Sequence, residues 1–376
     1  MIYLDYAATS PMRKESIDAY AEAASETYGN TQSLHDVGTK AAEYLTFCRN
    51  AFGEFLNVRG EGIYFTGNAS EGNQLAIRSI LRGRPKQCNQ ILTTHMEHAS
   101  VLTTMNELEK EGYQIRYMPV NQDGIVEIER LREEVNEHTA LIVIQLVNSE
   151  MGAIQPVAEC VAIGNVYGVP VHSDIVQAFG KIPVDLLSLG VTSAVLSAHK
   201  IGGPKGVGVV YLNPSVHWES AIEGTTHQQG FRAGTIDVPG IVAATIAAKL
   251  ARAEQESSYK KAQKLQKFLI DNLHPHVQIV GDNDLKSPFI QGILLPHVEG
   301  QWMMLECNRH QIAISTGTAC KIGHGEAVSA ITALGFGPDV ARRFIRISFN
   351  GKLEIEEVER FVNILNQTIK KEPLFR

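Results

Sequence analysis

The chain has 376 residues, of which 44% are hydrophobic and 20% are charged, with 32 glycines and 14 prolines. This composition excludes a disordered or collagen-like chain and predicts a globular protein with a large core. The formal net charge of −7 argues against nucleic acid or an anionic membrane as a direct partner, and no apolar run is long enough to span a bilayer.

The amino terminus and the cysteines indicate the compartment. Asp5 lies where a secretory signal peptide needs an apolar segment, which predicts a cytoplasmic protein. The cysteines are widely spread and include no CxxC pair: they are Cys48, Cys88, Cys160, Cys307 and Cys320. Neither a disulfide framework nor a zinc ribbon is expected from this spacing. The pair His95 and His98 lacks the rest of a metal site, so no metal is expected either.

Short apolar runs recur through the first two-thirds of the chain, and several are continuous, which is typical of strands buried on both faces. These runs predict strands at residues 63–65, 90–93, 115–120, 141–147, 170–173, 194–197 and 207–212. Helical patterns lie between them at residues 71–81, 100–112, 125–135 and 157–168. The alternation predicts an α/β fold with a mostly parallel sheet, which binds its ligands at the carboxyl ends of the strands.

After Gly234 the pattern changes to a mixture of helices and short strands. Helices are expected at residues 238–256, from there to residue 273, and at 301–310, 327–334 and 355–371. Strands are expected at residues 277–280, 291–295 and 346–349. We therefore expect a large domain over residues 1–256 and a smaller α+β domain over residues 257–376.

The first strand end with polar residues is the segment 66–71. Gly67 and small polar residues follow the predicted strand, and a helix then begins. Free N–H groups and the helix dipole at such a terminus favour a phosphate. The alternative is that Ser70 only caps the helix, and this segment alone leaves both interpretations open.

Two later strand ends carry a more specific set. Asp174 closes one predicted strand, with Gln177 three residues on, and the next strand runs into Ser197-Ala198-His199-Lys200. A lysine there can form a Schiff base with an aldehyde cofactor, and an aspartate can pair with a protonated pyridine nitrogen. The alternative is a surface lysine and a capping aspartate, which explains single residues but explains this combination poorly.

With these motifs the chain resembles the NifS/IscS family of cysteine desulfurases, which are pyridoxal 5′-phosphate (PLP) enzymes of the aspartate-aminotransferase fold. The resemblance runs from Leu4-Asp5-Tyr6-Ala7-Ala8-Thr9 to Arg346-Ile347-Ser348. The loop Ser315-Thr316-Gly317-Thr318-Ala319-Cys320 is specific for the desulfurases among these enzymes. The resemblance implies the PLP-dependent transferase fold, with about the first 14 residues packing on the smaller domain.

The resemblance also implies a role for each residue that would contact the cofactor. Lys200 is expected to hold PLP covalently, Asp174 to face the pyridine nitrogen and Gln177 to bond the phenolic oxygen. Further contacts are expected from Ala69, Ser70, Ser197 and His199 to the phosphate, from His98 stacked on the ring, and from Thr235 to the phosphate held by the other subunit of a homodimer. Ser149 stands where the family has an asparagine that contacts the cofactor.

The implied activity converts L-cysteine into L-alanine and a persulfide on Cys320. Arg346 is expected to bind the substrate carboxylate, and His98 to relay protons. The sulfur is expected to pass to an acceptor protein for iron–sulfur cluster, thio-cofactor or tRNA synthesis. The alternatives are a selenocysteine lyase or aminotransferase on the same fold, or a degenerate non-enzymatic partner protein, for which Ser149 is a first sign.

Overall fold

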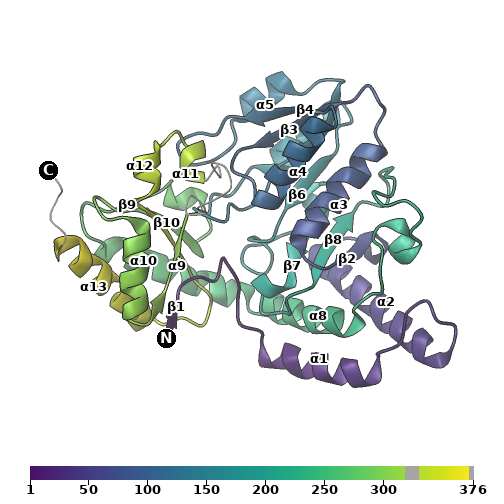
Figure 1. The fold of residues 1–376 in the computed structure, drawn as a ribbon, viewed down its shortest axis with the longest axis horizontal. Coiled ribbons are helices and arrows are strands. Elements are labelled where there is room, and N and C mark those ends of the chain that lie inside the picture. The colour runs from purple at the N-terminus through teal and green to yellow at the C-terminus, as the bar shows by residue number, and fades with distance from the viewer. Residues whose placement is uncertain (318–329, 372–376) are drawn as a thin grey trace.

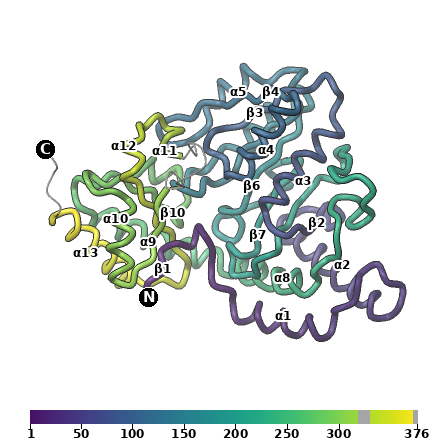
Figure 2. The backbone as a smooth tube through the Cα atoms, viewed as in Figure 1, coloured from purple at the N-terminus to yellow at the C-terminus, as the bar shows by residue number. Residues whose placement is uncertain are grey.

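The computed structural model describes residues 1–317 and 330–371, whereas residues 318–329 and 372–376 lie outside the described part of the chain. The large sheet and its helices lie on one side of the molecule, and the C-terminal helices surround a smaller sheet on the other side (Figures 1 and 2). The strands are β1 (Ile2–Tyr3), β2 (Ile63–Thr66), β3 (Gln90–Thr94), β4 (Gln114–Met118), β5 (Thr139–Val143), β6 (Val171–Asp174), β7 (Ser193–Ser197), β8 (Gly208–Leu212), β9 (Gln278–Ile279), β10 (Ile290–Leu294), β11 (Ile312–Ala313), β12 (Ser315–Thr316) and β13 (Phe344–Ser348).

The large sheet has seven strands in the order β2-β8-β7-β6-β5-β3-β4, and in the described part of the chain β8 is its one antiparallel member. The predicted mostly parallel sheet is therefore confirmed. All residues of the six strands other than the edge strand β4 are buried, as the continuous apolar runs predict. The predicted strand at 141–147 ends earlier, at Val143, and Val147 pairs with Ile154 in a separate bridge.

Helices cover both faces of this sheet. Leu141 and Val143 pack into a cluster with residues of α3 and α4, whereas Ile142 packs into a cluster with residues of α2, α6 and α8. This alternation follows from the two-residue period of a strand and gives three layers. The helices are α1 (Lys14–Glu26), α2 (Asp36–Leu56), α3 (Ala69–Arg82), α4 (Ala99–Lys110), α5 (Ile128–Glu134), α6 (Val157–Val166), α7 (Leu186–Leu189), α8 (Val238–Ala253), α9 (Gln255–Asn272), α10 (Gly300–Arg309), α11 (Ala330–Ala333), α12 (Pro338–Ala341) and α13 (Ile355–Lys371).

The sequence patterns did not predict α1 and α2. The buried residues of α1 are Ser16 and Ala23, so its apolar face is narrow and gives a periodicity argument little to detect. On α2 the buried residues recur every three or four positions, so the helical pattern was present in the sequence although exposed Tyr44 and Phe47 add apolar residues on the solvent side. No helix in residues 1–317 and 330–371 is long and apolar enough to cross a membrane.

The smaller sheet has the order β12-β13-β10-β9, and the amino terminus lies beside it because β1 pairs in parallel with β11. Ile2 and Leu4 pack into a cluster with Leu265, Ile345 and Phe361. The amino-terminal segment therefore connects the smaller sheet to α1. This helix packs on α8, one of the helices that cover the large sheet (Figure 1). We keep the division into two domains at residue 256 as a proposal.

Gly208 of β8 marks a close approach between this strand and the loop before α3. A Cβ atom at this position would lie 2.5 Å from the Asn68 carbonyl carbon and 2.5 Å from Thr66 Oγ1. We predict that Gly208→Ala lowers the free energy of unfolding by about 1–3 kcal/mol, because packed backbone must shift. Urea unfolding of the apoprotein measures the change.

Gly337→Ala is the matched control, since a Cβ atom there meets no atom within 4 Å. The control should change the free energy of unfolding by less than about 0.5 kcal/mol. Equal effects of the two substitutions would show that the close approach at Gly208 has no energetic weight.

Candidate active site

Parallel pairing of β6 and β7 brings two polar segments to the same edge of the large sheet. Asp174, the last residue of β6, lies beside Val195 of β7, and β7 ends two residues later at Ser197. The chain then forms the 3₁₀ turn η2 (Ala198–Lys200), which ends at Lys200. Because parallel strands present their carboxyl ends at one edge, Asp174 and Lys200 meet there, as the sequence predicts.

A pocket of about 400 Å³ lies at this edge. Its lining includes ten residues that the sequence predicts for the site: Ala69, Ser70, His98, Ser149, Asp174, Gln177, Ser197, His199, Lys200 and Arg346. They lie at or just after the carboxyl ends of β2, β3, β5, β6 and β7, and one lies in β13 of the smaller sheet. The fold therefore gathers side chains that are distant in sequence into one cavity, and their individual roles stay predictions.

Lys200 enters the pocket as a partly neutral amine. Its Nζ donates to the carbonyl oxygen of Ala7 and, at 2.7 Å, to that of Ala8. Burial and, to a smaller extent, nearby Arg346 lower the pKa of Lys200 to about 8 against the opposing effect of Asp174. A neutral amine is the form that can bond an aldehyde or take up a proton, so this environment suits a reactive lysine.

Asp174 is buried and is held by two donors. Its Oδ2 accepts from Asn73 Nδ2 at 2.9 Å, and its Oδ1 accepts from the backbone N–H of Val176 at 2.9 Å. Asn73 Oδ1 lies 2.9 Å from His172 Nε2, and His172 Nδ1 lies 2.6 Å from Ser193 Oγ. Burial lowers the pKa of His172 to about 4. Because Asn73 Oδ1 can only accept, the neutral ring carries its proton on Nε2 and donates it to Asn73. The NH₂ group of Asn73 then faces Asp174.

Asn73 is a site residue that the sequence reasoning missed. It is fully buried on α3, with Leu75, Ala76 and Ile77 close by in the chain and also buried. A buried amide must find partners for its donors and acceptor. An asparagine within the apolar part of a helix that begins at a strand end is therefore the signal that could have identified it.

His98 caps α4 and also lines the pocket. Its Nδ1 accepts from the backbone N–H of Ser100 at 3.2 Å and lies 2.8 Å from Ser100 Oγ, which in turn accepts from Asn73 at 3.0 Å. Since a backbone N–H only donates, Nδ1 has no proton, and the neutral ring carries its proton on Nε2. His98 can therefore cap α4 and line the pocket at the same time, whereas its stacking on a cofactor ring stays a prediction.

Another part of the pocket has the features of an anion site. The N-terminus of α3 lines it, and the cap of this helix is Asn68, whose side chain accepts from the Glu71 N–H at 2.8 Å. The interpretation of Ser70 as the capping residue is therefore wrong. Ser197 Oγ is buried without a hydrogen-bond partner in the described part of the chain. A phosphate there would accept from Ser197 and from the free N–H groups of the helix.

His199 supports the same part of the pocket as a neutral ring. Its Nδ1 lies 3.0 Å from Thr9 Oγ1. Burial and, to a smaller extent, the positive charges of Lys200 and Lys205 lower the pKa of His199 to about 4. A neutral imidazole offers one N–H donor, so His199 can donate to a phosphate without adding charge.

Arg346 reaches the pocket from β13 of the smaller sheet. Its Nη2 lies 2.7 Å from Asp5 Oδ1, and its Nη1 donates to the Ser149 carbonyl oxygen at 2.9 Å. Its Nε is buried and unpaired within residues 1–317 and 330–371. Ser149 lines the pocket, whereas Asn148 is occupied elsewhere and donates to the Met96 carbonyl oxygen at 3.0 Å. The neighbouring asparagine therefore does not take the place that Ser149 occupies.

Two predicted residues remain to be placed. Thr235 is exposed and is absent from the lining, so its assignment to a second subunit stays a prediction. Cys320 lies outside the described residues. Within residues 1–317 and 330–371, no group of three or more His, Cys, Asp or Glu side chains is arranged to hold a metal ion.

The chain is similar to known proteins over nearly its whole length. The aminotransferase class-V family model matches residues 2–361. The putative cysteine desulfurase NifS of Bacillus subtilis (strain 168) is 40% identical over 368 residues, covering 96% of this chain and 93% of the relative. The cysteine desulfurase IscS of Methanosarcina thermophila is 31% identical, covering 98% of this chain and 92% of the relative. A solved NifS-like protein has 31% identity and a TM-score of 0.91, covering 99% of this chain and all of that one.

The sheet topology, the lysine and aspartate at adjacent strand ends and the family match together define an α/β enzyme of the PLP-dependent transferase fold. The chain belongs to the aminotransferase class-V family and, within it, to the NifS/IscS branch. The predicted family resemblance is therefore confirmed.

The buried amide of Asn73 should carry a measurable share of the stability. We predict that Asn73→Ala lowers the free energy of unfolding of the apoprotein by about 2–4 kcal/mol, because Asp174 and His172 each lose a buried partner. Urea unfolding measures this change. Gln74→Ala is the control, since Gln74 is the exposed neighbour on the same helix. A similar small loss for both variants would contradict the role of the Asn73 network.

Glu97 should make the stability depend on pH. Glu97 is buried, and its Oε2 accepts from the backbone N–H of Gln145 at 2.8 Å. Burial raises the pKa of Glu97 from 4.5 to about 8. The folded protein therefore keeps a proton that the unfolded chain releases, and wild-type stability falls as the pH rises from about 5 to about 8.

Glu97→Gln removes this titration while keeping the size and shape of the side chain. We predict that the stability of this variant relative to wild type grows between about pH 5 and pH 8 and then levels off. Urea unfolding at several pH values measures the difference. A difference that stays constant with pH, or that grows as the pH falls, would mean that Glu97 is ionised in the folded protein.

Proposed function

We propose that this protein is a PLP-dependent cysteine desulfurase, which converts L-cysteine into L-alanine and leaves the sulfur as a persulfide on Cys320. The observation that supports this proposal most directly is the single pocket in which Lys200 and Asp174 meet at the ends of adjacent strands. The names of the relatives in the NifS/IscS branch agree with it.

The residues of the pocket fit PLP. Lys200 would hold the cofactor covalently, and the buried carboxylate of Asp174 would face its pyridine nitrogen. The N-terminus of α3, the unpaired Ser197 hydroxyl and neutral His199 would bind its phosphate. Gln177 would donate to its phenolic oxygen, and exposed Thr235 would reach the phosphate held by the second subunit of a homodimer.

The side chains divide the chemistry among themselves. PLP, when bound, supplies a pyridine ring that withdraws electrons from the substrate α-carbon. The Lys200 amine takes up the α-proton, which its lowered pKa allows near neutral pH. Asp174, whose carboxyl group is held in place by Asn73 and the Val176 N–H, would face the pyridine nitrogen. His98, with its proton on Nε2, has a donor available for proton relay.

Arg346 and Cys320 complete the proposed reaction. The guanidinium of Arg346, which lines the pocket, would bind the substrate carboxylate. The Cys320 thiolate would take the sulfur atom as the carbon–sulfur bond breaks. L-Cysteine and one thiol give L-alanine and one persulfide, so atoms and electrons balance without an external oxidant. An acceptor protein in the cytoplasm, where thiols remain reduced, would then receive the sulfur.

The reaction is tested with L-cysteine and a reductant that releases sulfide from the persulfide. We predict that the wild-type protein forms sulfide and alanine in equal amounts. Cys320→Ala should lose at least about a hundredfold in sulfide formation, because the nucleophile is gone. Cys88→Ala should remain active, since Cys88 is a buried thiol outside the pocket.

The other outcomes separate the alternatives. An aminotransferase would leave Cys320→Ala as active as wild type and would form a keto acid. A selenocysteine lyase would release selenide from selenocysteine and leave L-cysteine intact. A non-enzymatic partner protein would be colourless and would not be reconstituted by PLP, whereas the proposed enzyme is yellow and is bleached by borohydride at Lys200.

A further inference from the structure

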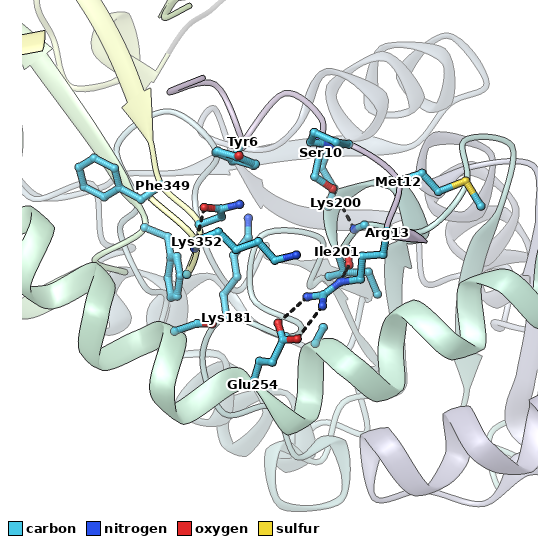
Figure 3. Close-up of a pocket in the computed structure, with 18 of the residues that line it drawn as sticks. Tyr6, Ser10, Met12, Arg13, Lys181, Lys200, Ile201, Glu254, Phe349 and Lys352 are labelled. Atoms are coloured by element: carbon cyan, nitrogen blue, oxygen red, sulfur yellow. Dashed lines mark hydrogen bonds and ion pairs between the residues drawn. The ribbon is translucent and has the colours of Figure 1, made fainter. Parts of the chain in front are cut away.

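A second cavity, of about 410 Å³, lies beside the candidate active site and shares Lys200 with it. Figure 3 shows this cavity, with Lys181, Lys352 and Glu254 among the side chains around it. Lys181 lies in the turn that follows β6 and is only 7% exposed. A buried lysine is unusual, because desolvating an ammonium group is costly unless the group is paired.

The ammonium of Lys181 donates to Gln177 Oε1 at 2.6 Å. In the part of the chain that the structure describes, this is its one polar contact, and that contact is an amide rather than a carboxylate. Burial and, to a smaller extent, the positive charges of Lys200 and Arg346 lower the pKa of Lys181 to about 7. A methionine or leucine would fill the same volume without this desolvation penalty.

The contact determines which way the amide of Gln177 points. An ammonium group has three donors and no acceptor, so the charged form of Lys181 requires the oxygen of Gln177 on its side. The NH₂ group of Gln177 then lies on the other side, where it donates to the Ala7 carbonyl oxygen at 2.9 Å. That same carbonyl oxygen accepts from Lys200. The donor end of Gln177 is therefore turned toward Lys200 and the pocket.

We propose that Lys181 is a positioning residue, which holds the amide of Gln177 so that its NH₂ group faces the phenolic oxygen of PLP. This inference rests on the proposed function, because it takes PLP as the ligand of the pocket. Without Lys181 only the Ala7 carbonyl oxygen would hold the NH₂ group, so the amide would be less strictly oriented toward an ionised phenolic oxygen. The buried positive charge adds to the effect, since it favours the ionised form of that oxygen.

The test compares PLP binding and the absorbance of bound PLP in Lys181→Met and wild type. We expect the dissociation constant for PLP to rise about tenfold in the variant, because one oriented donor is lost. The pH midpoint of the cofactor absorbance change should rise by about one unit, because an ionised phenolic oxygen is less favoured. Lys181→Arg, which also only donates, should restore part of both values.

Lys286→Met is the matched control. Lys286 is another buried lysine, 4% exposed, and it donates to the Val280 carbonyl oxygen at 3.1 Å, away from both cavities. This variant should change thermal stability about as much as Lys181→Met does, yet keep the wild-type dissociation constant and pH midpoint. A structural role alone would make the two variants alike in all three measurements.

A double-mutant cycle with Gln177→Ala tests whether Lys181 acts through Gln177. In that background, Lys181→Met should change PLP binding by less than about twofold, because the amide that it orients is gone. Fully additive effects, or a wild-type dissociation constant and midpoint in Lys181→Met, would overturn the inference. A wild-type protein that binds PLP but forms no sulfide would overturn only the proposed function, whereas one that binds no PLP would overturn both.

Discussion

The parallel pairing of β6 with β7, and the burial of Asp174 at the end of that pair, is the constraint on which the site depends. A carboxylate in a protein interior must be satisfied by donors. Asn73 supplies one from α3, on a face of the sheet opposite to α8, and His172 fixes the direction of that donor. A strand, a helix and a neighbouring strand are thus tied together by one group of buried hydrogen bonds.

The pocket also depends on the amino-terminal segment, which passes from the smaller sheet to the large one. Asp5 pairs with Arg346 of β13, and the carbonyl oxygens of Ala7 and Ala8 accept from Lys200 after β7. A side chain from the smaller sheet and one from the large sheet therefore both contact the short amino-terminal segment 5–8. A small relative shift of the two sheets would change the environment of the lysine, because its partners lie in the segment between them.

Positive charge is concentrated around the reactive lysine, and burial makes it effective. Arg346 lowers the pKa of Lys200, and Lys200 and Arg346 together lower the pKa of Lys181, since like charges in a poorly solvated region repel. Asp174 and Asp5 oppose this effect on Lys200 without cancelling it. The balance leaves an amine that is partly neutral near neutral pH and a pocket that favours anionic ligands such as a phosphate or a carboxylate.

The sequence by itself determined the mostly parallel sheet and indicated part of the pocket, because continuous apolar runs and polar strand ends are local patterns. Ala69, His98, Ser149 and Arg346 followed only from the family resemblance. The sequence patterns did not predict α1 and α2 and left the cap of α3 open, which the structure assigns to Asn68. Only the tertiary structure decided the roles of Asn73, Asp5 and Lys181. Their partners lie from four to more than three hundred residues away in the chain, and a buried donor acquires a direction only when its acceptor is in place.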